Sequence, residues 1–371
     1  MSFRVLVVAL FSFTLVLWSC SDDKKKDTPD AGGDSGPDTD TDADVAPYDF
    51  EAQAPWYLCP EEEFPEGATI VTAFDQTYQY FGDEDRRTVE SIVDFPASAD
   101  WARVGMWFNL ECPESGLCDH WDRAGSVQLV LNPQDDPGEW QQIELFRHMT
   151  PYKIEMCQYI DVTPMADLLT GQQTLTSFID TWVGPGHSNG EGWRVSVNFV
   201  FYPGANEGAD EIINIWGRRN INVGDTDPAA NVDSQIDPVT VSIPADATKV
   251  EAHITATGHG FGFTSNCAEF CQMRQDVMVN GTVHSVNPWR DDCAQNPISP
   301  QYGTWEYNRN GWCPGAIQIG DNIDITDSIN VGADNTIDFD ILMSDGTEYD
   351  NISTADGTPY EIIALRLYVY K

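Results

Sequence analysis

Short runs in which apolar and polar residues alternate recur along this chain from Tyr57 to its C-terminus, with turn residues between them. Clear examples are Val104–Phe108, Val195–Phe201 and Ile362–Tyr370. Because side chains on a strand point alternately to its two faces, this period of two is typical of half-buried β-strands. The pattern predicts an all-β chain of sandwich or barrel architecture, with one or two helical turns only at Met165–Leu169.

The alternation breaks at Pro203–Glu211 (PGANEGADE) and then starts again. A chain of 371 residues has the length of about two domains. We therefore predict two β domains, an N-terminal one over residues 55–205 and a C-terminal one over residues 206–371.

The N-terminus predicts export. Arg4 precedes an apolar run, Val5–Leu17, which is short for a permanent membrane helix. The following Leu17-Trp18-Ser19-Cys20 resembles a bacterial lipobox. We expect residues 1–20 to be a lipoprotein signal peptide, and Cys20 to carry the lipid that anchors the protein to the outer membrane or cell surface. An ordinary signal peptide cleaved nearby is the alternative.

Residues 21–54 read as a disordered, Asp-rich linker, since they lack the apolar residues that a core needs. Alternating aspartates between Asp38 and Asp44 lack the turn glycine and closing glutamate of a calcium loop. The whole chain has a net charge of −41, which makes nucleic acid an unfavourable partner.

Nine cysteines suggest disulfides in an oxidising compartment, with eight left if Cys20 is lipidated. Short spacings favour three local pairs, and elimination leaves a fourth. The expected pairs are Cys112–Cys118, Cys267–Cys271, Cys293–Cys313 and Cys59–Cys157. Zinc is the competing interpretation, but the chain lacks the usual Cys-x2-Cys pairs.

Four segments combine acids, aromatic residues and cysteines: 111–123, 180–182, 258–271 and 309–315. Carboxylates that share a cleft can divide into a base for water and a partner with a raised pKa. Tryptophan faces can pack against sugar rings, and arginine can stabilise developing negative charge. The simpler interpretation of any one of these acids is a solvated surface group.

The ordered motifs in these segments resemble the peptide-N-glycosidase F family. They are Glu111-Cys112-Pro113, Cys118-Asp119-x-Trp121-Asp122-Arg123, Thr150-Pro151-Tyr152, Thr181-Trp182, Cys267-Ala268-Glu269-x-Cys271 and Arg309-x-Gly311-Trp312-Cys313-Pro314-Gly315. The resemblance implies two tandem eight-stranded antiparallel jelly-roll sandwiches packed side by side, with the active site at their interface.

The resemblance also implies an amidase that cleaves the bond between asparagine and the first N-acetylglucosamine of an N-linked glycoprotein or glycopeptide. It implies a monomer that needs no metal or cofactor. Asp122 matches the principal catalytic acid, Glu269 a second carboxylate that acts through water, and Asp180 a third carboxylate. The expected substrate-binding residues are Asp119, Arg123, Trp182, His259, Arg309 and Trp312.

Three positions depart from the family pattern. Asp180 replaces a glutamate, Phe270 replaces a tryptophan, and Thr257 replaces a tryptophan that would face sugar. Three rival functions remain: a non-catalytic glycan-binding lipoprotein, a type II copper monooxygenase-like protein, and a glycosidase with a carboxylate pair. Copper chemistry needs grouped histidines, whereas the six here are scattered, without a His-x-His.

Overall fold

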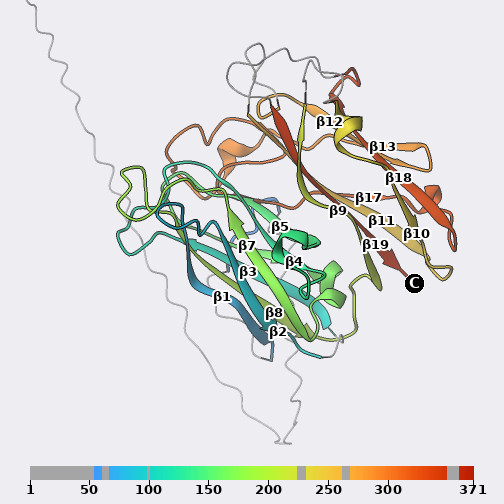
Figure 1. The fold of residues 1–371 in the computed structure, drawn as a ribbon, viewed down its shortest axis with the longest axis horizontal. Helices are drawn as coiled ribbons and strands as arrows, with labels where there is room; N and C mark the ends of the chain where they lie inside the picture. Colours follow the sequence, from blue (N-terminus) through green and yellow to red (C-terminus); the bar gives the residue numbers. More distant parts are fainter. Residues whose placement is uncertain (1–53, 61–66, 98–100, 224–230, 261–267, 349–358) are drawn as a thin grey trace, which may run out of the picture. The chain divides into compact units, whose positions relative to one another are not determined.

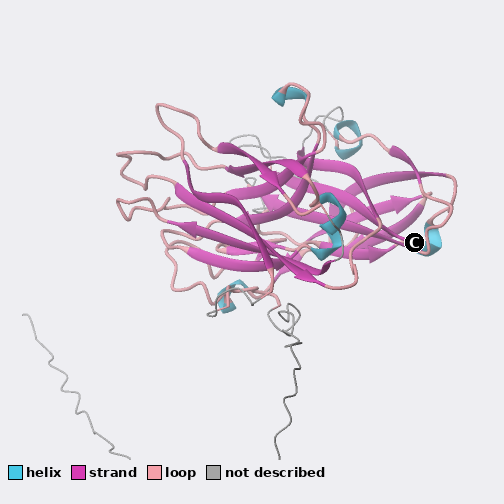
Figure 2. Cartoon of the chain, turned by 90° about the horizontal axis from the view of Figure 1, so that it is seen from below, coloured by secondary structure: helices cyan, strands magenta, loops and turns pink. Residues whose placement is uncertain are grey.

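The computed structural model describes residues 54–60, 67–97, 101–223, 231–260, 268–348 and 359–371. Strands account for most of the regular structure, and every strand pairing is antiparallel (Figures 1 and 2). The all-β prediction is therefore confirmed. The eight-stranded jelly-roll arrangement and the domain boundary near residue 205 stay predictions.

Two sheets come mainly from the first half of the chain, in the orders β1-β8-β3-β6 and β16-β5-β4-β7-β2. The strands are β1 (Thr69–Gln79), β2 (Thr88–Asp94), β3 (Trp101–Glu111), β4 (Ala124–Val130), β5 (Gln142–Met149), β6 (Met156–Asp161), β7 (Gln172–Ile179), β8 (Trp193–Pro203) and β16 (Ala316–Gln318). The edge strand β16 belongs in sequence to the predicted second domain, so the two halves share one sheet.

Three further sheets come from the second half, in the orders β17-β11-β19-β9, β10-β18-β12-β13 and β14-β15. The strands are β9 (Glu211–Asn222), β10 (Val239–Ser242), β11 (Lys249–His259), β12 (Met273–Val279), β13 (Thr282–Val286), β14 (Trp289–Arg290), β15 (Arg309–Asn310), β17 (Asp321–Asp324), β18 (Asp334–Met343) and β19 (Tyr360–Tyr370).

Alternation within the strands builds two separate cores. On β3, the side chains of Val104, Met106, Phe108 and Leu110 are fully buried, and they belong to a cluster with residues of β4, β5, β7 and β8. A second cluster joins β9, β11 and β19 to β12 and β18. Each large apolar side chain buried in this way contributes about 1.5–3 kcal/mol. Both halves of the chain are thus sandwiches of two sheets around an apolar layer.

Helical structure within the described ranges is short. It comprises η2 (Pro137–Glu139), η3 (Thr163–Leu168), α1 (Val232–Gln235), η5 (Cys293–Gln295) and η6 (Thr326–Ser328). The turn η3 confirms the helix expected near Met165–Leu169. No helix in the described ranges is long and apolar enough to cross a membrane. The segment Val5–Leu17, Cys20 and most of the predicted linker lie outside those ranges.

The disulfide predictions are confirmed wherever both cysteines are described. Cys59–Cys157, Cys112–Cys118 and Cys293–Cys313 are bonded. Cys271 is also disulfide-bonded, and its expected partner Cys267 lies outside the described residues.

Buried polar groups connect the two sandwiches. Arg147 on β5 donates from Nη1 to the carbonyl of Ile362 at 2.6 Å. Arg366 on β19 donates from Nη1 to the carbonyl of Glu144 at 2.6 Å. Since an unsatisfied buried guanidinium is costly, these bonds fix β5 against β19 in one register.

Candidate active site

The described residues of the four sequence segments with acids, aromatic residues and cysteines lie at the ends of strands. Asp122 precedes β4 and Asp180 follows β7, and the amide of Asp180 donates to the carbonyl of Ala124 at 2.9 Å. His259 ends β11 directly opposite Tyr360, the first residue of β19. Glu269 and Asn310 share a backbone hydrogen bond of 2.8 Å. Strand ends with loops between them are where a rigid scaffold positions functional side chains.

Asp119 organises the first of these segments. Its fully buried carboxylate accepts from Arg123 Nε at 2.9 Å and from the hydroxyl of Thr181 at 2.8 Å. Its other oxygen accepts from the amide of Trp121 at 3.1 Å. The disulfide Cys112–Cys118 closes the loop just before it. Asp119 and Arg123, both expected to bind substrate, thus hold the loop that carries Asp122.

Arg309 lies at the centre of the site, with no exposed side-chain surface. Its Nε lies 3.1 Å from Glu269 Oε1, and its Nη2 lies 3.5 Å from Asp122 Oδ2. Nη1 donates to the carbonyls of Thr304 and Tyr307, and Nη2 donates to the Thr304 hydroxyl. Four of the five N–H groups of the guanidinium thus donate hydrogen bonds within the described residues, and the contact with Asp122 is a longer ion pair. Arg309 therefore holds the two carboxylates near each other.

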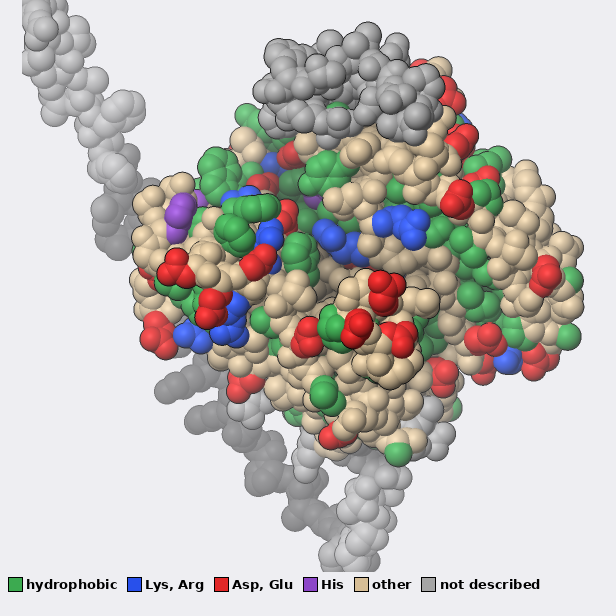
Figure 3. Space-filling model, viewed as in Figure 1, with side chains coloured by type: hydrophobic (Ala, Val, Ile, Leu, Met, Phe, Trp, Pro, Cys, Tyr) green, Lys and Arg blue, Asp and Glu red, His purple; other side chains and the backbone are tan. Residues whose placement is uncertain are grey.

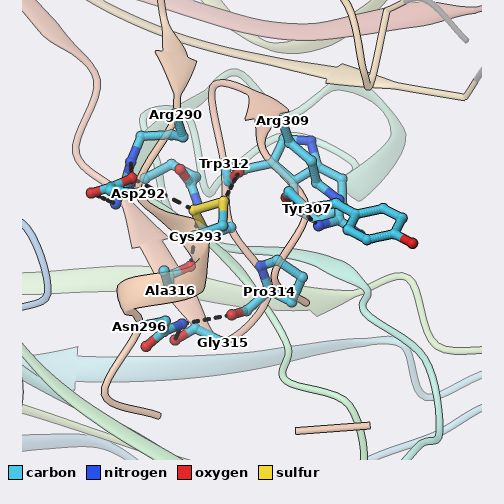
Figure 4. Close-up of a disulfide and its surroundings, with 12 residues drawn as sticks. Arg290, Asp292, Cys293, Asn296, Tyr307, Arg309, Trp312, Pro314, Gly315 and Ala316 are labelled. Atoms are coloured by element: carbon cyan, nitrogen blue, oxygen red, sulfur yellow. Dashed lines mark hydrogen bonds and ion pairs between the residues drawn. A yellow bond between two sulfur atoms is a disulfide. The ribbon is translucent and has the colours of Figure 1, made fainter. Parts of the chain in front are cut away.

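The segment that carries Arg309 is fixed by the Cys293–Cys313 disulfide and by close packing (Figure 4). The guanidinium lies over the rings of Trp312 and Phe270, with centroid distances of 4.6 and 5.2 Å. Gly311 has a φ of +82°, and a side chain there would meet the carbonyl of Ala256. Only glycine allows this close approach of the two backbones.

The two acids that meet at Arg309 have raised pKa values. Burial raises the pKa of Asp122, and the charges of Arg309 and Arg123 only partly offset this effect. Burial raises the pKa of Glu269 to about 7; Arg309 opposes the rise and the charge of Asp122 adds to it. Oδ2 of Asp122 is buried and has no hydrogen-bond partner among the described residues. An acceptor oxygen of this kind is available to a water molecule or a substrate.

His259 is held as a neutral imidazole beside Thr257. Arg147 donates to the hydroxyl oxygen of Thr257 at 3.0 Å. The same oxygen lies 2.8 Å from Nε2 of His259, and the tautomer of the ring decides which of these two atoms donates. Burial, followed by nearby arginines, lowers the His259 pKa well below its ordinary value, which keeps the ring neutral.

Aromatic rings fix the orientation of that imidazole. His259 stacks between Trp312 at 5.4 Å and Tyr360 at 5.3 Å. The indole of Trp312 is almost fully buried and donates to the carbonyl of Gly258 at 2.7 Å. Trp312 therefore forms the wall behind His259. Thr257 is fully buried as well, so its side chain faces the interior and not the cleft surface.

Asp180 and Trp182 lie apart from this cluster. Arg87 stacks over the rings of Trp182 at 4.4 Å and Phe81 at 4.8 Å, and its Nη1 lies 3.5 Å from Asp180 Oδ1. Trp182 is 51% exposed and Asp180 keeps 41% of its side chain accessible. These residues make an exposed rim, and none of the contacts described here joins Asp180 directly to Asp122, Glu269 or Arg309.

Several residues of the site were not expected from sequence. Tyr152 is buried beside Asp122: burial, and then the charge of Asp122, raises the pKa of its hydroxyl. Glu361 is fully buried, and its Oε1 accepts from Asn310 Nδ2 at 2.6 Å. Burial raises the pKa of Glu361 to about 7. Tyr152 lies within the Thr150-Pro151-Tyr152 motif and could have been found there, whereas nothing in the sequence marks Glu361.

One group of metal-type ligands occurs in the described part of the chain, namely Asp292, Cys293 and Cys313. The two cysteines are joined to each other, so they do not offer thiolates to a metal.

Comparisons with known proteins agree with the motif pattern. Residues 228–357 match the family described as "Peptide-N-glycosidase F, C terminal". The Peptide-N(4)-(N-acetyl-beta-D-glucosaminyl)asparagine amidase F of Elizabethkingia miricola is 26% identical over 280 residues, which is 71% of this chain and 74% of that protein.

Solved structures show the same fold. Recombinant peptide: N-glycanase F (PNGase F) superposes with a TM-score of 0.65 at 22% identity, covering 82% of this chain and 96% of that one. PNGF-II gives a TM-score of 0.64 at 16% identity, covering 82% of this chain and 65% of that one. The resemblance to the peptide-N-glycosidase F family is confirmed in sequence and in fold.

Proposed function

We propose that this chain, a relative of peptide-N-glycosidase F, hydrolyses the amide between an asparagine side chain and the first N-acetylglucosamine of N-linked glycans. The relationship supports a peptide-N-glycosidase-like hydrolase of carbon–nitrogen bonds, acting on glycoproteins or glycopeptides. The single observation that carries the assignment is that Asp122 and Glu269 both contact the buried guanidinium of Arg309.

We assign different roles to the two acids, Asp122 and Glu269. In the proposed reaction, Asp122 takes a proton from a water molecule through Oδ2, which has no hydrogen-bond partner among the described residues. The water oxygen bonds to the amide carbon, and the carbon–nitrogen bond then breaks as the nitrogen takes up a proton. The products are a glycosylamine and an aspartate residue in the peptide, whose new oxygen comes from water.

Glu269 acts in its ionised form as an acceptor that orients water and binds the proximal sugar. Arg309 holds both acids in place and offsets part of their repulsion. Neutral His259, fixed between Trp312 and Tyr360, lies near them, and Asp180 with Trp182 supplies an acidic and aromatic rim. These groups provide acid–base and hydrogen-bonding chemistry without a metal or cofactor.

One experiment tests the reaction directly. The soluble body, residues 45–371, is incubated with an N-glycopeptide in water enriched in heavy oxygen, and the peptide is analysed by mass spectrometry. Amide hydrolysis converts the asparagine to aspartate with one solvent oxygen. Release of glycan with asparagine intact or bearing one sugar indicates a glycosidase. Binding without release indicates a glycan-binding protein on the same scaffold.

The proposal also covers the location of the enzyme. A lipid on Cys20 and a linker over residues 21–54 would hold the catalytic body outside the cytoplasm as a monomer. The disulfides among the described residues support export, since such bonds persist in oxidising compartments.

A further inference from the structure

A polar groove of about 620 Å³ runs between the two sandwiches and takes no part in the proposed chemistry. Strand β9 lines one side of it with Asn214, Arg218, Arg219 and Asn220, and the other side is lined by Gln128 of β4 and by Trp140–Gln142. Figure 3 shows Lys and Arg side chains in a hollow near the middle of the face of the molecule that is turned toward the viewer. A groove of this volume is in the usual range for a small-molecule site, about 300–1,000 Å³.

The two arginines of this groove form no ion pair within the described residues. Most other described arginines lie in ion pairs, for example Arg87, Arg147 and Arg309. The chain carries 60 acidic against 19 basic residues, so two neighbouring arginines without a contacting acid are unusual; the charge of Asp237 acts on Arg219 without forming an ion pair with it. The guanidinium of Arg218 lies 5.1 Å from the centroid of the Phe178 ring, and its buried Nε has no hydrogen-bond partner in the described ranges. Stacking on the ring fixes the plane of the guanidinium in the absence of a contacting carboxylate.

The remaining lining suits the hydroxyl groups of a sugar. The amide of Gln142 donates from Nε2 to Thr176, and the amide of Asn214 donates to the Gln142 carbonyl, so both are fixed in orientation. Their side-chain oxygens remain as acceptors. Trp140 directs its indole N–H to the carbonyl of Asp135 at 3.0 Å. Fixed amides and a tethered indole provide oriented hydrogen bonds and a flat apolar surface.

One end of the groove lies near the rim of the active site, because the Arg218 guanidinium lies over the ring of Phe178, two residues before Asp180. Burial, followed by the charge of Arg147, lowers the pKa of Arg218, whereas the charges of Glu144, Asp180 and Tyr360 act in the opposite direction. Arg218 is thus within electrostatic reach of the rim acid Asp180. Tyr360 in turn stacks on His259 at 5.3 Å. A branched glycan whose first sugar lies at Glu269 can therefore extend toward Arg218 and Arg219.

We propose that this groove binds a carboxylate carried by an outer sugar of the glycan, so that the enzyme prefers N-glycans with acidic residues. The inference rests on the proposed function and adds a substrate class to it. Arg218 and Arg219 pair with the carboxylate, while Gln128, Gln142 and Trp140 contact the sugar ring that bears it. A carboxylate also occurs on acidic side chains of the peptide, and the experiment separates the two sources.

The test uses three glycopeptides that share the sequence around the glycosylated asparagine. The first has a neutral glycan and a neutral peptide, the second ends the same glycan in N-acetylneuraminic acid, and the third has a neutral glycan and two added glutamates. The kcat/KM ratio of the second to the first is compared between wild type and Arg219→Gln. Arg219 is exposed, so its replacement leaves the fold intact.

Arg219→Gln is expected to lower that ratio about two- to fivefold, as is typical for loss of a solvent-exposed ion pair. Arg219→Lys should keep most of the preference, because the charge remains. The control Lys249→Gln removes one positive charge from a strand end where Lys249 pairs with Glu251, and should leave the ratio unchanged. Equal ratios in Arg219→Gln and Lys249→Gln overturn the proposal, as does an effect confined to the glutamate peptide.

A binding measurement separates this proposal from the reaction itself. The protein is titrated with a trisaccharide that ends in N-acetylneuraminic acid and with its neutral counterpart, at low and high salt, while tryptophan fluorescence is recorded. Tighter binding of the acidic sugar that weakens with salt and in Arg219→Gln supports the groove even if no glycan is released. Equal binding of the two sugars contradicts it even if the amidase reaction is confirmed.

Discussion

Nε of Arg309 lies 3.1 Å from Oε1 of Glu269, and yet the pKa of Glu269 is raised to about 7. A contacting cation ordinarily lowers the pKa of a carboxyl group. Here burial has a larger effect on the Glu269 pKa than Arg309 has, because the charge of Arg309 is shared between two acids. The negative charge of Asp122 further opposes the ionisation of Glu269. The ionisation of Glu269 near neutral pH is therefore coupled to the charge of Asp122.

The first prediction is a rise in activity with pH. Because the pKa of Glu269 is raised to about 7, its carboxylate is largely protonated at pH 6 and largely ionised at pH 8. If the ionised form orients water, kcat/KM should increase through about pH 7. The Glu269→Gln variant should be severely impaired. Its residual activity should not show the part of the rise in kcat/KM with pH that depends on Glu269. A profile of kcat/KM from pH 5 to pH 9 measures both. If kcat/KM of Glu269→Gln rises with pH as it does in wild type, Glu269 is not the group that causes the rise.

The second prediction concerns Asp122. Asp122→Asn keeps the size of the side chain but removes the base, so glycan release should fall by about 10²–10⁴. Folding should be retained, since asparagine has the size of the aspartate it replaces and a neutral amide costs less to bury than a carboxylate. Release is followed by mass spectrometry and folding by thermal unfolding.

Asp119→Asn is the matched control for that variant. It weakens the contacts to Arg123 and Thr181, and should lower the melting temperature by several degrees along with activity. For the Asp122→Asn variant itself, glycan release at the wild-type rate would show that Asp122 is not the base in the reaction.

Sequence reasoning predicted the parts of this structure that are local. The strands within 195–201, 249–257 and 362–370 follow directly from alternation, and β8, β11 and β19 contain them. The pair Cys112–Cys118 follows from a spacing of six residues. The convergence of Asp122, Glu269 and Arg309 was available only through the family motifs, because no local pattern shows that three distant loops meet.

The buried polar network could not be predicted from patterns. Arg147 and Thr257 are 110 residues apart, and each alone looks like a surface residue of a strand. Glu144 and Arg147 pair in the interior at 2.7 Å, which reverses the usual link between charge and exposure. Thr257, which sequence reasoning treated as a lost sugar-facing position, is instead the link between Arg147 and His259.

The third prediction tests the rim. Asp180→Glu restores the residue of the related family and lengthens the side chain by one methylene. Asp180 is half exposed and its closest ionic contact is the Arg87 guanidinium at 3.5 Å, so the longer side chain has room. We expect kcat/KM to be unchanged or higher. A loss of tenfold or more would show that the shorter acid is required at this rim.

The fourth prediction tests the anchor. Cys20→Ala in the full chain should release the protein from membranes or block its processing, because the lipid attachment point is lost. The readout is the partition of the protein between membrane and soluble fractions after cell lysis, with Ser21→Ala as the control. Membrane attachment that persists in Cys20→Ala contradicts the lipoprotein assignment, whatever the enzyme's activity.

The fifth prediction concerns stability and Glu361. Burial raises its folded-state pKa from 4.5 to about 7. Below pH 4.5 the carboxyl is protonated in the folded and the unfolded chain alike. Between 4.5 and 7 the unfolded chain loses the proton while the folded chain keeps it. The stability contributed by protonated Glu361 is therefore lost as the pH rises through about 7, by up to about 3 kcal/mol.

Glu361→Gln removes this titration and keeps an acceptor for Asn310 Nδ2. The free energy of unfolding in urea should therefore decrease less between pH 5 and pH 8 in Glu361→Gln than in wild type. Glu90→Gln, an exposed change on β2, is the control and should follow the wild-type curve. Glu269 titrates in the same pH range, so the free energy of unfolding of Glu361→Gln should still decrease somewhat with pH. This remaining decrease should become smaller in the double variant with Glu269→Gln. Parallel curves for wild type and Glu361→Gln would show that Glu361 does not keep its proton at neutral pH in the folded protein.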